Sequence, residues 1–241
     1  IKIVEDCAQA HGAQINGKNV GTFSDIASWS FCQDKIISTG GEGGMLTTNN
    51  KDIFEQIRSY RDHGKNFKAI DKTKSTGEFK YIHDSFGTNY RLSEMQSCIG
   101  RVQLQKLKYW NELRTNNAKI LIEYLKGLDN VRLPLPKEKF KHAWYKFYIY
   151  LKEENLSSGW SRKRIIDEIN NLGYPAFSGS CSEIYLENSF KNYLYRNYER
   201  LPNAHKLGKT SLMFLVHPTI TSESMHKYAS TIKKILIQSM G

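Results

Sequence analysis

A long stretch of regularly spaced apolar residues between Ser93 and Leu128 constrains the fold more than any other feature of this sequence. The apolar positions that recur at three- and four-residue steps are Ile99, Val102, Leu104, Leu107, Trp110, Leu113, Ile120, Leu121, Tyr124 and Leu125. This spacing gathers them on one side of a helix. We expect one long helix, or two helices end to end, stopped by Gly127. A chain of 241 residues, of which 39% are hydrophobic, can supply the core that such a helix needs.

The residues before this stretch have the pattern of short strands joined by turns. Residues 1–4 predict a short buried strand, residues 26–31 a second one, and residues 45–48 a third one after a glycine-rich turn. A helix is expected over residues 52–60. Residues 64–84 are polar, rich in lysine and punctuated by glycine, so we predict a long loop there.

The part of the chain after the long helix mixes strands and helices. Residues 144–151 predict a strand, residues 162–172 a helix and residues 212–216 a short buried strand. Ser222 is expected to cap a last helix. The sequence contains no internal repeat and no low-complexity tract.

The order of these elements predicts two domains. An α/β domain over residues 1–130 would include the long helix, and a smaller α+β domain would follow over residues 131–241. The first part of the chain offers only about three strands, too few to complete the sheet of an α/β domain. The chain also opens at Ile1, directly inside an apolar run. We therefore expect it to be the C-terminal part of a longer polypeptide.

The distribution of charge disfavours some classes of protein. The net charge of +11 comes from residues 51–241, since residues 1–50 are net negative, and the positive excess is dispersed rather than gathered in one basic run. Dispersed charge is typical of a solvated surface, and it also suits an anionic substrate such as a sugar diphosphate. It gives little support to a nucleic-acid-binding module. Since no stretch approaches the roughly eighteen apolar residues of a membrane span, we expect a soluble, cytoplasmic protein without membrane contact.

The motifs of several other chemistries are absent. The sequence has no H-E-x-x-H, no G-x-S-x-G, no phosphate loop of the G-x-x-x-x-G-K-[ST] type and no histidines and cysteines at metal-ligand spacing. No metal site is expected. The four cysteines Cys7, Cys32, Cys98 and Cys181 are scattered without a C-x-x-C pair, so we predict free, buried thiols. The glycines of residues 40–44 are not a dinucleotide fingerprint, and they predict a tight turn.

Three polar residues near the predicted strand ends could carry chemistry together. Asp6 follows the first strand, Ser30 lies near the end of the second, and Lys35 comes five residues later. Each has an ordinary interpretation, because an aspartate after a strand often forms a turn and most lysines are solvated. Together they match the needs of pyridoxal phosphate. A lysine amine forms an imine with its aldehyde, a carboxylate keeps its pyridinium nitrogen protonated, and hydroxyl donors bind its phosphate.

Longer runs of sequence make the resemblance to one family specific. Residues 4–12, residues 29–44, residues 58–64 and residues 87–96 resemble the DegT/DnrJ/EryC1/StrS family of sugar aminotransferases in composition, order and spacing. The resemblance spans essentially the whole chain and is tightest in its first hundred residues. It implies a pyridoxal-phosphate-dependent aminotransferase of fold type I, aspartate aminotransferase-like, with a partial large domain and a small α+β C-terminal domain.

The resemblance also implies a role for five residues. Lys35 would hold the cofactor and act as general base and acid for the 1,3-proton shift. Asp6 would pair with the pyridinium nitrogen, Gln9 would lie against the ring near its 3-hydroxyl, and Ser30 would donate to the phosphate. In this family an asparagine at the place of Asn89 reaches the phosphate of the neighbouring subunit's cofactor, which implies a homodimer with shared active sites.

The reaction implied is transfer of an amino group from an amino acid, usually glutamate, to a keto-sugar attached to a nucleotide diphosphate. The sequence leaves the sugar, the nucleotide and amination at carbon 3 or carbon 4 open. The patterns of residues 31–35 and 40–45 favour the 4-amino branch, the perosamine-synthase-like enzymes of surface-polysaccharide assembly. One departure is Cys32, where some relatives have histidine. A larger one is the absence of the family's first portion, which supplies a phosphate-binding turn and the aromatic residue stacked on the cofactor, so we expect the isolated chain to bind cofactor poorly or not at all.

Two other functions compete with this interpretation. The first is a pyridoxal- or pyridoxamine-dependent sugar dehydratase of the same family, in which histidine replaces the lysine, and Lys35 argues against it. The second is a binding or regulatory module that has kept the fold and lost activity, which a truncated chain allows.

Overall fold

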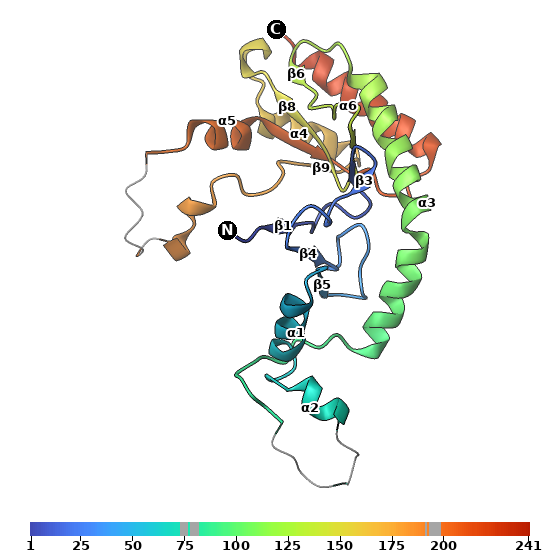
Figure 1. Cartoon of the computed structure of the whole chain (residues 1–241). Helices are drawn as coiled ribbons and strands as arrows, with labels where there is room; N and C mark the ends of the chain where they lie inside the picture. Colours follow the sequence, from blue (N-terminus) through green and yellow to red (C-terminus); the bar gives the residue numbers. More distant parts are fainter. Residues whose placement is uncertain (73–76, 78–81, 191, 193–198) are drawn as a thin grey trace. The chain divides into compact units, whose positions relative to one another are not determined.

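The chain forms two compact units, which we describe from a computed structural model covering residues 1–72, 77, 82–190, 192 and 199–241. Unit 1 comprises Ile1–Lys108 and Glu138–Ala143, and unit 2 comprises Tyr109–Lys137 and Trp144–Gly241. The predicted long helix is a single helix, α3 (Glu94–Leu125), and it contributes to both units (Figure 1). The units divide inside this helix rather than near residue 130, because the end of α3 is buried in the core of unit 2. The domain boundary of the intact protein stays a prediction.

The main sheet of unit 1 has three strands in the order β1 (Val4–Asp6), β4 (Ile26–Ser30) and β5 (Gly44–Thr47). β1 runs parallel to β4, and β5 runs antiparallel to it (Figure 1). The prediction of a buried strand over residues 1–4 was wrong, since the strand begins at Val4 and this residue is 66% exposed. β1 is exposed because β4 is its only hydrogen-bonded neighbour among the described residues.

A second, smaller sheet in unit 1 joins distant segments. Its strands are β2 (Gln14–Ile15), β3 (Lys18–Asn19) and β7 (Phe140–Lys141), with β2 in the middle. The β2–β3 turn uses Asn16 and Gly17, both at positive φ, as the Asn-Gly pair predicts. β7 comes from the segment after α3. Its pairing with β2 makes this segment part of unit 1.

Two further helices belong to unit 1. α1 (Lys51–Tyr60) begins after Asn50, whose side chain accepts hydrogen bonds from the amides of Asp52 and Ile53. α2 (Phe67–Lys72) lies inside the stretch that was predicted to be a long loop. The interval from residue 73 to residue 81, apart from residue 77, falls outside the described residues, so the rest of the loop prediction is only partly testable.

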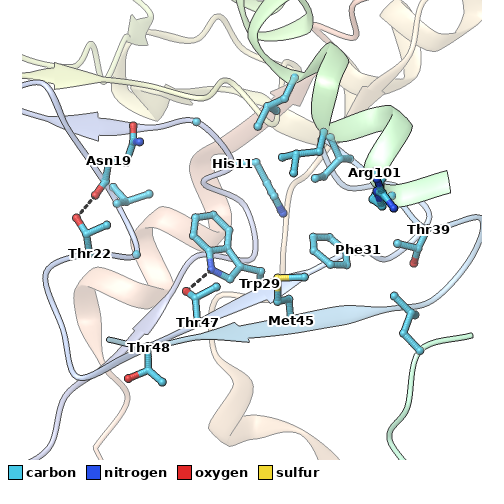
Figure 2. A pocket seen from close by; sticks show the side chains of 18 of the residues that line it. His11, Asn19, Thr22, Trp29, Phe31, Thr39, Met45, Thr47, Thr48 and Arg101 are labelled. Atoms are coloured by element: carbon cyan, nitrogen blue, oxygen red, sulfur yellow. Dashed lines mark hydrogen bonds between the residues drawn. The ribbon is translucent and has the colours of Figure 1, made fainter. Parts of the chain in front are cut away.

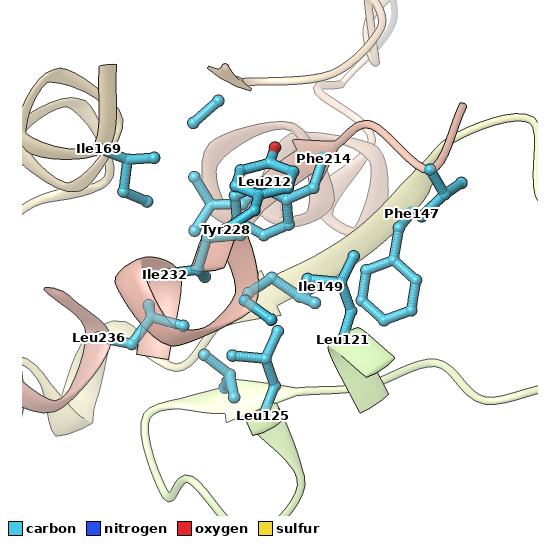
Figure 3. Close-up of a cluster of buried hydrophobic side chains, with 14 of the residues drawn as sticks. Leu121, Leu125, Phe147, Ile149, Ile169, Leu212, Phe214, Tyr228, Ile232 and Leu236 are labelled. Carbon is cyan, nitrogen blue, oxygen red and sulfur yellow. The ribbon is translucent and has the colours of Figure 1, made fainter. Parts of the chain in front are cut away.

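Unit 2 is built on a four-stranded antiparallel sheet. The strand order is β6 (Val131–Arg132), β8 (Phe147–Leu151), β10 (Ser211–Phe214) and β9 (Ala176–Phe177). Its α-helices, besides the end of α3, are α4 (Arg162–Asn171), α5 (Pro202–Thr210) and α6 (Ser222–Gln238). Short 3-10 turns span Glu153–Asn155, Ile184–Leu186 and Asn188–Phe190. Side chains from β8, β10, α3, α4 and α6 meet in one apolar core (Figure 3).

Two local predictions need correction. Thr221, and not Ser222, caps α6, because the Thr221 hydroxyl accepts the hydrogen bond from the amide of Ser224. All four cysteines are free, but only Cys7 is buried, whereas Cys98 and Cys181 are exposed. Cys98 lies on the exposed side of α3. Within the described part of the chain, no helix has the length and apolar character needed to cross a membrane.

Candidate active site

The ends of two parallel strands bring Asp6 and Ser30 to the same edge of the sheet in unit 1. Asp6 is registered opposite Ser28 on β4, and Ser30 lies two residues further along that strand. Since side chains alternate along a strand, Asp6, Ser28 and Ser30 project from one face. The Asp6 carboxylate accepts a hydrogen bond from the amide of Ala8 at 3.0 Å, and the Ser30 hydroxyl accepts one from the amide of Cys32 at 3.3 Å. Both groups hold their local turns in place.

Lys35 lies in the turn that follows β4. Its amide donates to the carbonyl of Cys32 at 3.1 Å, and the turn closes where the amide of Thr39 donates to the carbonyl of Phe31 at 3.3 Å. The next two residues, Ile36 and Ile37, are 3% and 4% exposed. Their burial anchors the backbone beside Lys35, while the lysine side chain itself remains half-buried. The turn therefore holds one amine at a defined place beyond the strand ends.

A buried histidine lies beside this lysine. His11 is 3% exposed, and its ring centroid lies 5.3 Å from that of Trp29 and 5.9 Å from that of Phe31 (Figure 2). Burial and, to a smaller extent, the positive charge of Lys35 together lower the pKa of His11 to about 4, against a hydrogen bond with the backbone of Ser30. His11 is therefore neutral at pH 7. No role was predicted for it from the sequence, although it lies in the first of the family-like runs.

The glycine-rich loop after Lys35 is fastened to the start of α3. The amide of Ser38 donates to Oε1 of Gln103 at 2.7 Å, and Nε2 of Gln96 donates to the carbonyl of Glu42 at 2.8 Å. Gln96 also forms a capping box with Ser93, since its Oε1 accepts from the Ser93 amide and the Ser93 hydroxyl accepts from its amide. The Ser-x-x-Gln spacing in the sequence is typical of such a capping box. Nothing local in the sequence indicated the contact with the loop.

Gln9 and Asn89 lie in different surroundings. Gln9 is exposed in the turn three residues after Asp6. Asn89 is also exposed, but it pairs through its backbone with Asp62, just after α1, and its side chain accepts from Nε of Arg91 at 3.0 Å. Gln9 and Lys35 thus lie in the turns that follow the strands ending in Asp6 and Ser30. Asn89 belongs to the segment that pairs with the end of α1 and the residues just after it.

A large apolar cavity of about 720 Å³ lies on the other face of the same sheet. It is lined by His11, Trp29, Phe31 and Met45 together with apolar side chains of α3 (Figure 2). Trp29 also donates from Nε1 to the hydroxyl of Thr47 at 3.0 Å. Trp29 and Phe31 flank Ser30 and therefore project away from the face that carries it. The cavity therefore lies on the face of the sheet opposite to Asp6 and Ser30. It is distinct from the edge where Lys35 lies.

The family is decided by comparison with known proteins. Residues 1–233 match the model of the DegT/DnrJ/EryC1/StrS aminotransferase family. The chain belongs to this family. Aminotransferases of the family depend on pyridoxal phosphate, which is the cofactor that Asp6, Ser30 and Lys35 predict. These three residues fit the group chemically, since an exposed carboxylate and a hydroxyl lie at adjacent strand ends before a half-buried amine.

Solved and curated relatives match nearly the whole chain. The aminotransferase from Psychrobacter cryohalolentis is 44% identical with a TM-score of 0.95, and the match covers 99% of this chain and 62% of that one. The UDP-N-acetyl-3-dehydro-alpha-D-glucosamine 3-aminotransferase of Acidithiobacillus ferrooxidans is 30% identical over 98% of this chain and 60% of its own. The dTDP-3-amino-3,6-dideoxy-alpha-D-galactopyranose transaminase of Aneurinibacillus thermoaerophilus is 30% identical over 97% of this chain and 58% of its own.

These comparisons confirm the predicted fold as a partial one. The chain spans about 60% of the length of the relatives that it matches. Its architecture is that of fold type I aminotransferases, with part of the large domain and the small domain present.

Proposed function

We propose that the polypeptide to which this chain belongs transfers an amino group from glutamate to a keto-sugar carried by a nucleoside diphosphate. The observation that supports this most is the placement of an acid, a hydroxyl and an amine at one sheet edge. Asp6 and Ser30 end adjacent parallel strands, and Lys35 follows in a turn anchored by buried neighbours. Family membership and the amino-sugar transaminases among the relatives support it further.

Each residue would have one task toward the cofactor. Bound pyridoxal phosphate supplies an electron sink for the bonds around the transferred nitrogen. Lys35 would hold it through its amine and then carry the proton between the two carbons concerned. Asp6 would keep the ring nitrogen protonated, with Gln9 near the 3-hydroxyl and Ser30 donating to the phosphate. Asn89, exposed beside α1, would reach the cofactor of a second subunit in a homodimer.

The charge of the chain and the names of its relatives support the proposed substrate class. The net charge of +11 favours an anionic ligand through long-range attraction, and a nucleoside diphosphate supplies two negative phosphates. The two curated relatives described above are named for UDP- and dTDP-linked sugars with nitrogen at carbon 3. Amination at carbon 4, for surface-polysaccharide assembly, stays the prediction from residues 31–35 and 40–45. Incubation with 3-keto and 4-keto sugar nucleotides, followed by NMR of the product, separates the two positions.

The half-reaction with the amino donor tests the proposal. We expect the full-length protein, loaded with pyridoxal phosphate, to lose its visible absorption band when glutamate is added and to gain the band of the pyridoxamine form. A nucleotide-linked keto-sugar should then restore the original band and yield an amino sugar by mass spectrometry. The same keto-sugar without the nucleotide is the control and should restore it poorly. A spectrum that no amino acid changes contradicts the transaminase function.

A further inference from the structure

One carboxylate in unit 1 holds a loop against the strand that ends in Asp6. The side chain of Glu5 accepts hydrogen bonds from the amide of Gly21 at 2.6 Å, from the amide of Phe23 at 3.2 Å and from the hydroxyl of Ser24 at 3.2 Å. These donors belong to the loop between β3 and β4. A carboxylate that accepts two backbone amides and a hydroxyl makes strong, charge-assisted contacts, so Glu5 and this loop form a rigid clasp.

Among the described residues, β1 has few other contacts that fix its position. It is three residues long and pairs only with β4 among the described residues. A second carboxylate, Asp25, holds the start of the strand by accepting from the amide of Ile3 at 3.0 Å and from the ammonium of Lys2 at 2.9 Å. Asp25 therefore acts at the beginning of β1, and Glu5 acts next to its carboxyl end.

The geometry connects Glu5 with its neighbour Asp6. Successive side chains of a strand point to opposite faces, so Glu5 grips the loop from one face while Asp6 projects from the other. Any shift of the backbone at residue 5 would carry the Asp6 carboxylate with it. Burial and the charges of Glu5 and Asp6 together raise the pKa of the adjacent Cys7 thiol to about 11.

We propose that Glu5 is a positioning residue that fixes the Asp6 carboxylate for the cofactor. This inference rests on the proposed function, because Asp6 matters only if the ring nitrogen of pyridoxal phosphate faces it. Glu5 itself would touch neither cofactor nor substrate, because its side chain points away from the face that carries Asp6. Its effect comes through the clasp with the loop of residues 21–24.

Glu5→Gln in the full-length protein tests the inference. The glutamine amide brings N–H donors to a site filled with donors, so part of the clasp is lost without a change in side-chain size. In the cofactor-free protein, we expect hydrogen exchange at the amides of Gly21 and Phe23 to become about tenfold faster. In the loaded protein, we expect the dissociation constant for pyridoxal phosphate to rise about tenfold and the pH at which its visible band titrates to shift.

Asp25→Asn is the matched control, because it weakens the separate contacts that hold the other end of β1 and leaves the Glu5 clasp intact. It should speed exchange at the amide of Ile3 and leave the dissociation constant within about twofold of the parent value. Unchanged exchange at Gly21 and Phe23 in Glu5→Gln overturns the clasp. Equal losses of cofactor affinity in both variants, or no shift of the titration in Glu5→Gln, overturn the positioning role.

The exchange measurement needs no cofactor, which separates the two proposals. If the parent protein has no lysine-dependent band, the proposed function fails whatever the exchange data show. If the parent protein has that band and Glu5→Gln leaves its titration unchanged, only the role of Glu5 fails.

Discussion

Lys35→Ala in the full-length protein is expected to lower the rate of amino transfer by about 10⁴-fold or more. This substitution removes two contributions at once, because the same amine would hold the cofactor and carry the proton during transfer. Positioned proton transfer alone is typically responsible for about 10²- to 10⁴-fold in rate. Lys35 is half-buried in its turn, so alanine leaves the buried anchors Ile36 and Ile37 in place and the fold should persist. Single-turnover kinetics with glutamate would measure the loss.

A second lysine of the same unit supplies the control. Lys18 is exposed in β3, at the turn next to Gly17, and Lys18→Ala should leave the rate within about twofold. Circular dichroism should show the same folded content for both variants. Near-parental turnover by Lys35→Ala contradicts the role proposed for this lysine.

Phe214→Ala is expected to destabilise unit 2 by about 3–5 kcal/mol, the range for deleting a buried phenylalanine side chain. Phe214 is fully buried at 0% exposure on β10, which lies between β8 and β9. Its ring meets that of Tyr228 from α6 edge-on, with 6.1 Å between the ring centroids (Figure 3). Alanine would leave a cavity between the sheet and α6 that the surrounding core cannot fully close. Urea-induced unfolding of the chain measures the change.

Phe177→Ala is the matched control for the core. Phe177 lies on the neighbouring strand β9, is 43% exposed and pairs with Met213 of β10. Its removal should cost about 1 kcal/mol or less, since a half-exposed side chain leaves no closed cavity. Equal losses in the two variants would show that the core is not centred on β10.

The elements with strong periodicity could be predicted from the sequence. The apolar spacing of residues 93–128 predicts helix because it repeats with the helical period, although it left one helix or two end to end open, and the structure has one. The exposure of β1 could not be predicted, since an apolar run indicates a strand but not which of its sides is covered. The prediction of Ser222 as the cap of α6 was wrong, and Thr221 is the cap. Two adjacent hydroxyl residues offer the same capping signal, so the sequence alone does not distinguish them.

In the candidate site, too, residues marked by local sequence patterns could be predicted, whereas contacts between distant positions could not. Asp6, Ser30 and Lys35 could be named because strand ends and their spacing are local features. The contact of Ser38 with Gln103 spans 65 positions, and that of Glu5 with Gly21 spans 16, so no local pattern indicates them. His11 was missed because burial beside Trp29, and not its neighbours in sequence, places it next to Lys35. The role of Asn89 depends on a second copy of the chain and stays a prediction.

Reduction of the loaded full-length protein with borohydride, followed by peptide mapping, identifies the residue that holds the cofactor. Borohydride converts an imine between a lysine and pyridoxal phosphate into a stable secondary amine, so the cofactor stays on the residue that held it. We predict that the label is found on the peptide containing Lys35 and is missing when Lys35 is alanine. Label on another lysine of the chain, or none on a protein that shows the visible band, would contradict the assignment of Lys35 as the residue that holds the cofactor.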